Sequence, residues 1–172
     1  GRMAARPDGS LAVITSGEKV VTVTEGQVTP YINEHLDQPV GIAVSEDGTI
    51  YVSNQGNLHN VSVFDPKGTY QKSIGVKGGR PAMGTFNPQG MYHPDGIDLD
   101  AEGGLWVAES ASAPKRISVW NVKTGKNVDQ FFGGSSYFAY GYIDPAQPTE
   151  IYGHNVLWDI NWDNYTTEPK TT

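Results

Sequence analysis

The side chains best suited to bind a ligand carry oxygen atoms and stand near the ends of apolar segments. Asn54 and Glu109 each follow such a segment, and Asp95 stands at the start of another. Carboxylate and amide oxygens are the ligands that Ca²⁺ prefers. These three residues are therefore a candidate calcium site. The alternative is a structural role, because Asn and Glu can cap turns and Asp can accept a hydrogen bond from a backbone amide.

Four histidines, His35, His59, His93 and His154, raise the question of a zinc site. Zinc requires imidazoles that converge on one ion, and we interpret these four as separate loop histidines. The sequence contains no Gly-x-Ser-x-Gly nucleophile motif, no phosphate-binding loop and no cysteine. Motifs of these enzyme classes are thus absent from the sequence.

The candidate oxygen ligands belong to a repeated unit of two strands joined by a tight turn. Residues 94–109 read PDGIDLDAEGGLWVAE, and residues 39–54 read PVGIAVSEDGTIYVSN. The entry proline, both glycines and the apolar positions of the strands coincide. Segments 61–65 (VSVFD) and 117–121 (ISVWN) repeat in the same way, so the unit extends to a third strand.

Two less regular copies flank the clear ones. Residues 1–32 are expected to form four strands joined by turns that contain Gly, and residues 140–162 three strands, with no clear fourth strand before 166–169. Because helical periodicity is absent, the prediction is an all-β chain of four-stranded antiparallel units. The expected units span residues 1–35, 36–78, 93–134 and 135–165.

An insert rich in Gly and Pro, residues 76–93, separates the second unit from the third. We interpret it as a surface connector. A functional loop is the alternative, since long loops in compact domains often carry function. Arg80, Met83, Phe86 and Tyr92 would then form a lip over a pocket.

Composition limits the classes of partner. The 172 residues suffice for one domain with a sizeable core. A net charge of -7, with scattered Lys and Arg, argues against a nucleic-acid partner. No apolar run reaches the roughly 18 residues that a membrane-spanning helix needs. The absence of cysteine leaves the compartment open.

The repeat resembles the NHL-repeat family of β-propellers. The resemblance is carried by Pro-x-Gly-Ile, then Gly followed by (Tyr/Trp)-Val, then Ser-Val-(Phe/Trp)-(Asp/Asn), and by the Gly-rich segment 74–88. It implies radial blades of four antiparallel strands. Propellers of this family commonly have six blades, so four copies predict an incomplete propeller, completed by further sequence or by another subunit. A closed ring of four blades is the alternative.

The resemblance also bears on activity. In the family's lyases that act on peptidyl hydroxyglycine, a metal-binding His directly follows the entry proline; here Val40 and Asp95 hold those positions, which argues against that activity. Similar propellers include lactonases of the gluconolactonase type, which use calcium. Some NHL propellers bind RNA through a basic face, which this acidic chain does not offer.

In such a blade, the start of the first strand and the loop after the second strand lie at the same end. We expect ligand-binding residues there, namely Asn54, Arg80, His93, Asp95, Glu109 and Tyr140. The predicted function is a non-catalytic scaffold, without a cofactor, that binds a protein, peptide or glycan or joins other subunits. The alternative is a calcium-dependent lactonase or hydrolase that uses Asn54, Asp95 and Glu109.

Overall fold

The computed structural model of the protein describes residues 2–82, 85–110, 114–133, 141–143, 145–153, 156–164 and 166–170. Throughout these residues the regular secondary structure consists of β-strands, which confirms the predicted all-β class. A helix of the length and apolarity required to cross a membrane is not found in this part of the chain.

The strands form four antiparallel sheets, each made of four strands that follow one another in the sequence. In chain order the strands are β1 (Met3–Ala5), β2 (Leu11–Ile14), β3 (Val20–Thr24), β4 (Gln27–Ile32), β5 (Pro39–Val44), β6 (Ile50–Asn54), β7 (Asn60–Phe64), β8 (Tyr70–Ile74), β9 (Pro94–Leu99), β10 (Gly104–Glu109), β11 (Lys115–Asn121), β12 (Asn127–Gly133), β13 (Gly141–Ile143), β14 (Glu150–Gly153), β15 (Val156–Asn161) and β16 (Thr166–Pro169). Within each sheet every strand pairs with its successor, which is the arrangement of a propeller blade. We call the sheets blades one to four.

Blade four corrects one expectation. Residues 166–169, expected to lie outside the blade, form its outer strand β16, which pairs with β15 from Trp158↔Pro169 to Asn161↔Thr166. Only the last residue of β16 is buried. This strand is formed by backbone pairing at an exposed edge. Its sequence has no alternating apolar pattern from which it could have been predicted.

Two apolar cores hold the first three blades together. Between blades one and two, Ile14 and Val20 pack with Ile42, Ile50 and Phe64. Every residue of β6 and β7 is buried, because blade two has a neighbour on each side.

The second core, between blades two and three, contains Tyr51, Val61 and Ile74 of blade two together with Leu105 and Trp120 of blade three. The two cores lie on opposite faces of blade two. Blade two is therefore a central sheet that is covered on both sides.

The inner strands of blades two and three converge at Gly41. A Cβ atom at this position would lie 2.2 Å from the backbone oxygen of Asp95, so no larger residue fits without a backbone shift. Beside it, Ser53 Oγ donates a 2.7 Å hydrogen bond to the same oxygen. The repeated glycine of the inner strand thus allows neighbouring blades to approach closely.

The segment between blades two and three is packed into the molecule. Arg80, Phe86 and Met91 are all buried, and Met91 belongs to the second core. The prediction that residues 76–93 form a surface connector was therefore wrong for these three residues. Met83, the other apolar residue assigned to a lip, lies outside the described residues.

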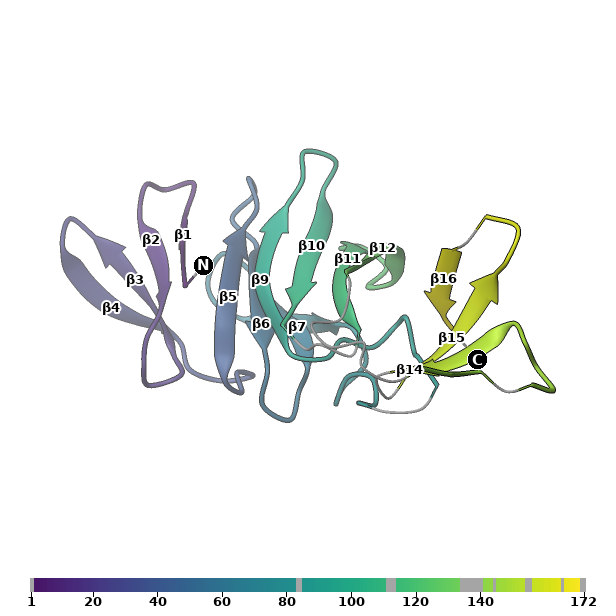
Figure 1. The fold of residues 1–172 in the computed structure, drawn as a ribbon. Coiled ribbons are helices and arrows are strands. Elements are labelled where there is room, and N and C mark those ends of the chain that lie inside the picture. Colours follow the sequence, from purple (N-terminus) through teal and green to yellow (C-terminus); the bar gives the residue numbers. More distant parts are fainter. Residues whose placement is uncertain are drawn as a thin grey trace.

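Blade four is attached at the periphery. The ring of Phe132 in β12, the outermost strand of blade three, lies edge-on to Phe86 and Trp158, with centroid distances of 5.5 Å and 6.3 Å. Phe86 N also donates to the Lys170 oxygen. Blades one and four lie at opposite ends of the row of sheets (Figure 1).

Candidate functional site

Each blade has two ends. The predicted ligand-binding residues belong to the end at which the inner strand begins, here called the entry end. Gln55 N donates to the Gln38 oxygen in blade two, and Ser110 N donates to the His93 oxygen in blade three, at 3.1 and 2.9 Å. The loop after the second strand therefore lies beside the start of the first strand, as predicted.

Glu109 lies inside this end rather than at its surface. Its Oε2 accepts hydrogen bonds from Arg80 Nε, Arg80 Nη2 and the backbone N of Tyr92, at 3.1, 3.0 and 2.9 Å. Its Oε1 accepts from Arg116 Nη1 at 2.9 Å. The carboxylate and both guanidinium groups are almost completely buried. Glu109 therefore pairs with two cations in the interior.

The side chain of Asn54 also makes hydrogen bonds within the protein. It is fully buried, its Oδ1 accepts from the backbone N of Asp37 at 3.0 Å, and its Nδ2 donates to Ser62 Oγ at 3.0 Å and to the Val52 oxygen at 3.2 Å. The amide thereby ties the loop before blade two to β7. This is the structural role that the sequence left as the alternative.

The other predicted site residues differ in exposure. Asp95 is exposed and His93 is half-buried, whereas Arg80 is buried against Glu109. Tyr140 and His154 lie outside the described residues. Of the predicted ligand-binding residues that the structure describes, Asp95 and His93 are therefore accessible to solvent.

His93 belongs to a small ring cluster with His59 and Tyr92. The centroid of His93 lies 4.8 Å from that of His59 and 4.6 Å from that of Tyr92. His59 Nδ1 accepts a 3.1 Å hydrogen bond from the backbone N of His93. Burial, followed by the charge of His93, lowers the pKa of His59 from its ordinary value. A neutral His59 suits this arrangement, since its Nδ1 serves as an acceptor.

Within the described parts of the chain, no three His, Asp or Glu side chains gather in a way that could hold a metal ion. The oxygens of Glu109 accept bonds from arginines, and the oxygen of Asn54 accepts a backbone bond. Calcium binding by these residues and Asp95 stays a prediction, tested below.

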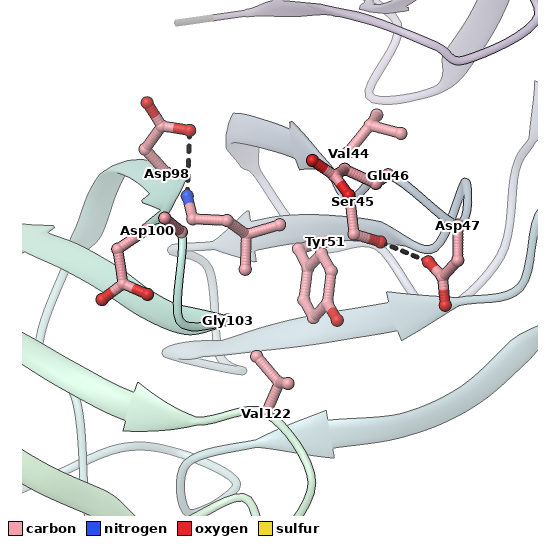
Figure 2. A pocket seen from close by; sticks show the side chains of 11 residues that line it. Val44, Ser45, Glu46, Asp47, Tyr51, Asp98, Asp100, Gly103 and Val122 are labelled. Atoms are coloured by element: carbon pink, nitrogen blue, oxygen red, sulfur yellow. Dashed lines mark hydrogen bonds between the residues drawn. The ribbon is translucent and has the colours of Figure 1, made fainter.

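The opposite end of the blades, here called the turn end, contains a groove of about 520 Å³ between blades two and three. Tyr51 lies in its middle, with Glu46 and Asp47 on one side and Asp98 and Asp100 on the other (Figure 2). Val44, Leu99 and Val122 add apolar surface. The groove therefore combines apolar side chains with four carboxylates.

The local hydrogen bonds keep two of these carboxylates charged. Asp47 accepts from Ser45 Oγ and from Thr49 N, and these bonds lower its pKa. The indole N–H of Trp106 and the backbone N of Gly104 likewise lower the pKa of Asp100. Burial raises the pKa of the Tyr51 hydroxyl, so it stays neutral among these anions.

Reasoning from the sequence missed this groove. It treated the first hairpin turn of each blade only as backbone geometry and assigned ligand binding to the entry end. The available signal was the acidic residues in and beside the first turn of two neighbouring blades, Glu46 and Asp47 in blade two and Asp98 and Asp100 in blade three.

No protein-family model matches the chain, and neither does any curated protein sequence. Solved structures do match it. A chain in the crystal structure of a nidogen/laminin complex superposes with a TM-score of 0.59 at 15% identity, over 99% of this chain and 79% of that one.

Virginiamycin B lyase from Staphylococcus aureus superposes with a TM-score of 0.53 at 13% identity, over 99% of this chain and 54% of the lyase. A structural genomics protein of unknown function from Bacteroides thetaiotaomicron gives a TM-score of 0.50 at 21% identity, over 59% of this chain and 30% of that chain. The chain therefore spans about half of the lyase. With the four-stranded sheets, these similarities confirm a β-propeller fold, and at such identities they show the fold alone.

Proposed function

We propose that this protein is a non-catalytic propeller scaffold of the NHL type that binds a protein or peptide segment. The observation that carries the proposal is the groove at the turn end, which is open to solvent and lies between two blades held together by a shared core. Propellers commonly place their ligands on one end of the blades, while the strands supply a rigid frame. The structural similarity to a chain from a nidogen/laminin complex fits a propeller that contacts another protein.

The chemistry of the groove favours a basic segment. Four carboxylates, Glu46, Asp47, Asp98 and Asp100, line it together with Tyr51, and the whole chain carries a net charge of -7. Lysine and arginine side chains pair with carboxylates through their charged ends while their methylene stems pack on apolar surface. A short peptide with Lys or Arg beside apolar residues matches both features of the groove.

A peptide-binding experiment tests this function. The full chain is probed against arrays of basic, neutral and acidic peptides, and the best basic peptide is then titrated by fluorescence anisotropy between roughly 0.05 and 0.5 M salt. We expect basic peptides to bind preferentially, and binding to weaken as salt increases. The variants Glu46→Gln and Asp98→Asn should each weaken binding about two- to five-fold, the range for one exposed charge pair.

Glu25→Gln supplies the matched control, because Glu25 is an exposed turn carboxylate of blade one outside the groove. This variant should bind like the wild type. Equal binding of acidic and basic peptides, or equal losses in the Glu25 variant, would refute the proposal. Binding to a glycan array that the groove variants leave unchanged would replace the peptide with a carbohydrate ligand.

A further inference from the structure

Blade three has one face that is apolar and uncovered. Trp106, Ile117 and Phe131 share this face and are 38%, 45% and 49% exposed. The rings of Trp106 and Phe131 are stacked, with centroids 5.8 Å apart and planes within 5° of parallel. Adjacent large apolar side chains on a single sheet face mark a surface that takes part in contacts.

The register of the strands shows what kind of contact this is. Trp106 pairs with Val119 as Tyr51 pairs with Val63, so Trp106 and Tyr51 occupy equivalent places. By the same comparison, Ile117 corresponds to Val61 and Phe131 to Ile74. Tyr51, Val61 and Ile74 are 5%, 0% and 0% exposed, because blade three covers them. The exposed face of blade three is thus the same face that blade two uses to bind its next neighbour.

Gly96 supports this interpretation independently. It occupies the position of Gly41 in the repeat, where a Cβ would collide with the next inner strand. At Gly96, by contrast, an added Cβ would meet no atom within 4 Å, and the residue has no positive φ that would require glycine. The absence of a side chain at Gly96 is explained if another inner strand packs against it.

Blade one presents the matching half of such a junction. Its face away from blade two is aliphatic and consists of Met3, Leu11, Val13, Val21, Val23 and Val28. Leu11 corresponds by register to Ile50 and Val13 to Val52, both fully buried against blade one. Met3 and Val28 are each 65% exposed. Blade one therefore offers the surface that a preceding blade would cover.

Blade four does not fill either position. It is joined to the outer strand of blade three through Phe132 and Trp158, and to the linker through Phe86. Phe132 pairs with Arg116, whose side chain lies in the interior toward blade two, so this attachment is on the opposite face from Trp106. Among the described residues, Trp106, Ile117 and Phe131 remain exposed with blade four in place.

We propose that two copies of this chain associate head to tail in a closed pair, with the face of blade three of each copy packed on the face of blade one of the other. In such a pair a two-fold axis relates the two contacts, and three blades from each copy form a ring of six. The junctions continue the pattern already present between blades one and two and between blades two and three. This inference rests on the propeller fold and is independent of the groove ligand.

The mass of the full chain in solution tests the association. Sedimentation equilibrium at micromolar concentration and about 0.15 M salt should give twice the chain mass. A monomer over the whole concentration range would overturn the proposal, and so would open-ended polymers, because they would exclude the closed ring. Dilution should dissociate the dimer and shift the emission of Trp106 to longer wavelength, and Trp106→Phe should remove that shift.

Paired variants test the head-to-tail geometry. Ile117→Glu and Leu11→Glu each place a carboxylate in both junctions of a pair, so each alone should weaken dimerisation at least ~100-fold. An equimolar mixture retains one junction in which both faces are wild type, so it should regain dimers. Failure of the mixture to recover any dimer would refute the pairing of these two faces.

Val128→Glu is the matched control, since Val128 is an exposed residue of the outer strand of blade three that lies at a register shift and has no paired residue in β11. It should dimerise like the wild type. Because Ile117 and Leu11 are partly exposed, their variants should retain the wild-type circular dichroism spectrum. If the Val128 variant lost dimerisation as the other two do, the assignment of the face would be wrong.

Discussion

Arg116 Nη1 and Glu109 Oε1, on adjacent strands of blade three, form a 2.9 Å ion pair whose two side chains are completely buried. Arg80 approaches the other oxygen of the same carboxylate from the linker. One buried carboxylate therefore pairs with two guanidinium groups.

Glu109→Gln should strongly destabilise the protein. The substitution removes the carboxylate that pairs with both guanidinium groups. Loss of one partner from a buried ion pair typically costs about 3–5 kcal/mol. We expect a loss of this size in the free energy of unfolding measured by urea denaturation.

Asp8→Asn is the control for that experiment. Asp8 also pairs with an arginine, Arg6, but its side chain is 56% exposed. An exposed pair contributes about 0–1 kcal/mol. A similar loss in both variants would contradict the assigned importance of burial.

Gly41→Ala should disrupt the junction between blades two and three. The new methyl group would lie 2.2 Å from the Asp95 oxygen and 2.8 Å from Ser53 Oγ, so the inner strands must separate. Overpacking of this kind costs about 1–3 kcal/mol or more, and thermal unfolding should report a clear fall in Tm. Gly17→Ala, which meets only Thr15 Oγ1 at 3.8 Å and has no positive φ, should leave Tm nearly unchanged.

Stability should decrease in mild acid because of His59. Its pKa is lower in the folded protein than the ordinary value of 6.5, chiefly through burial and the neighbouring His93, with Arg80 acting in the same direction and Asp37 opposing. The unfolded chain therefore takes up a proton first as the pH falls below about 6.5. The contribution to stability is present above that pH and is lost as the pH falls through the folded pKa.

His59→Asn should reduce this pH dependence. Asn tolerates the φ of +44° found at this position, and its Oδ1 can accept the hydrogen bond from His93 N. Plots of Tm against pH for the two proteins should diverge between roughly pH 7 and 5, with a shallower slope for the variant. Parallel curves would exclude His59 as the source.

Calcium addition tests the lactonase alternative. We expect millimolar calcium to leave Tm unchanged, since a metal would have to displace arginine from Glu109 and a backbone amide from Asn54. Magnesium serves as the control ion. A rise in Tm that is specific to calcium, and is lost in Asp95→Asn, would instead support the predicted metal site.

The sequence predicted the fold well because the repeat encodes backbone requirements. The aligned glycines and apolar positions of 39–54 and 94–109 specify two strands and a turn whatever surrounds them. Strand β16 was not predicted, because its residues are mostly exposed and its pairing depends on β15. No local sequence pattern distinguishes it from a loop.

The environment of the candidate site could not be predicted, because it depends on contacts between distant residues. Glu109 is equivalent in the repeat to Asn54, and nothing in its local sequence indicates that Arg80, 29 residues earlier, neutralises it. The position of both residues at the entry end was predictable. Their burial was not, since burial is decided by how the linker folds over the blade.

The linker also determines where this chain can be divided. Arg116 donates to the backbone oxygens of Gly90 and Pro88, and Arg80 donates to that of Pro114. A fragment that starts at Pro94 would retain the four strands of blade three but lose the Gly90 and Pro88 oxygens and one of the cations, Arg80. Any piece of the chain that keeps the buried contacts of blade three should therefore begin near Val76, so the structural boundary of this blade differs from the boundary of the repeat.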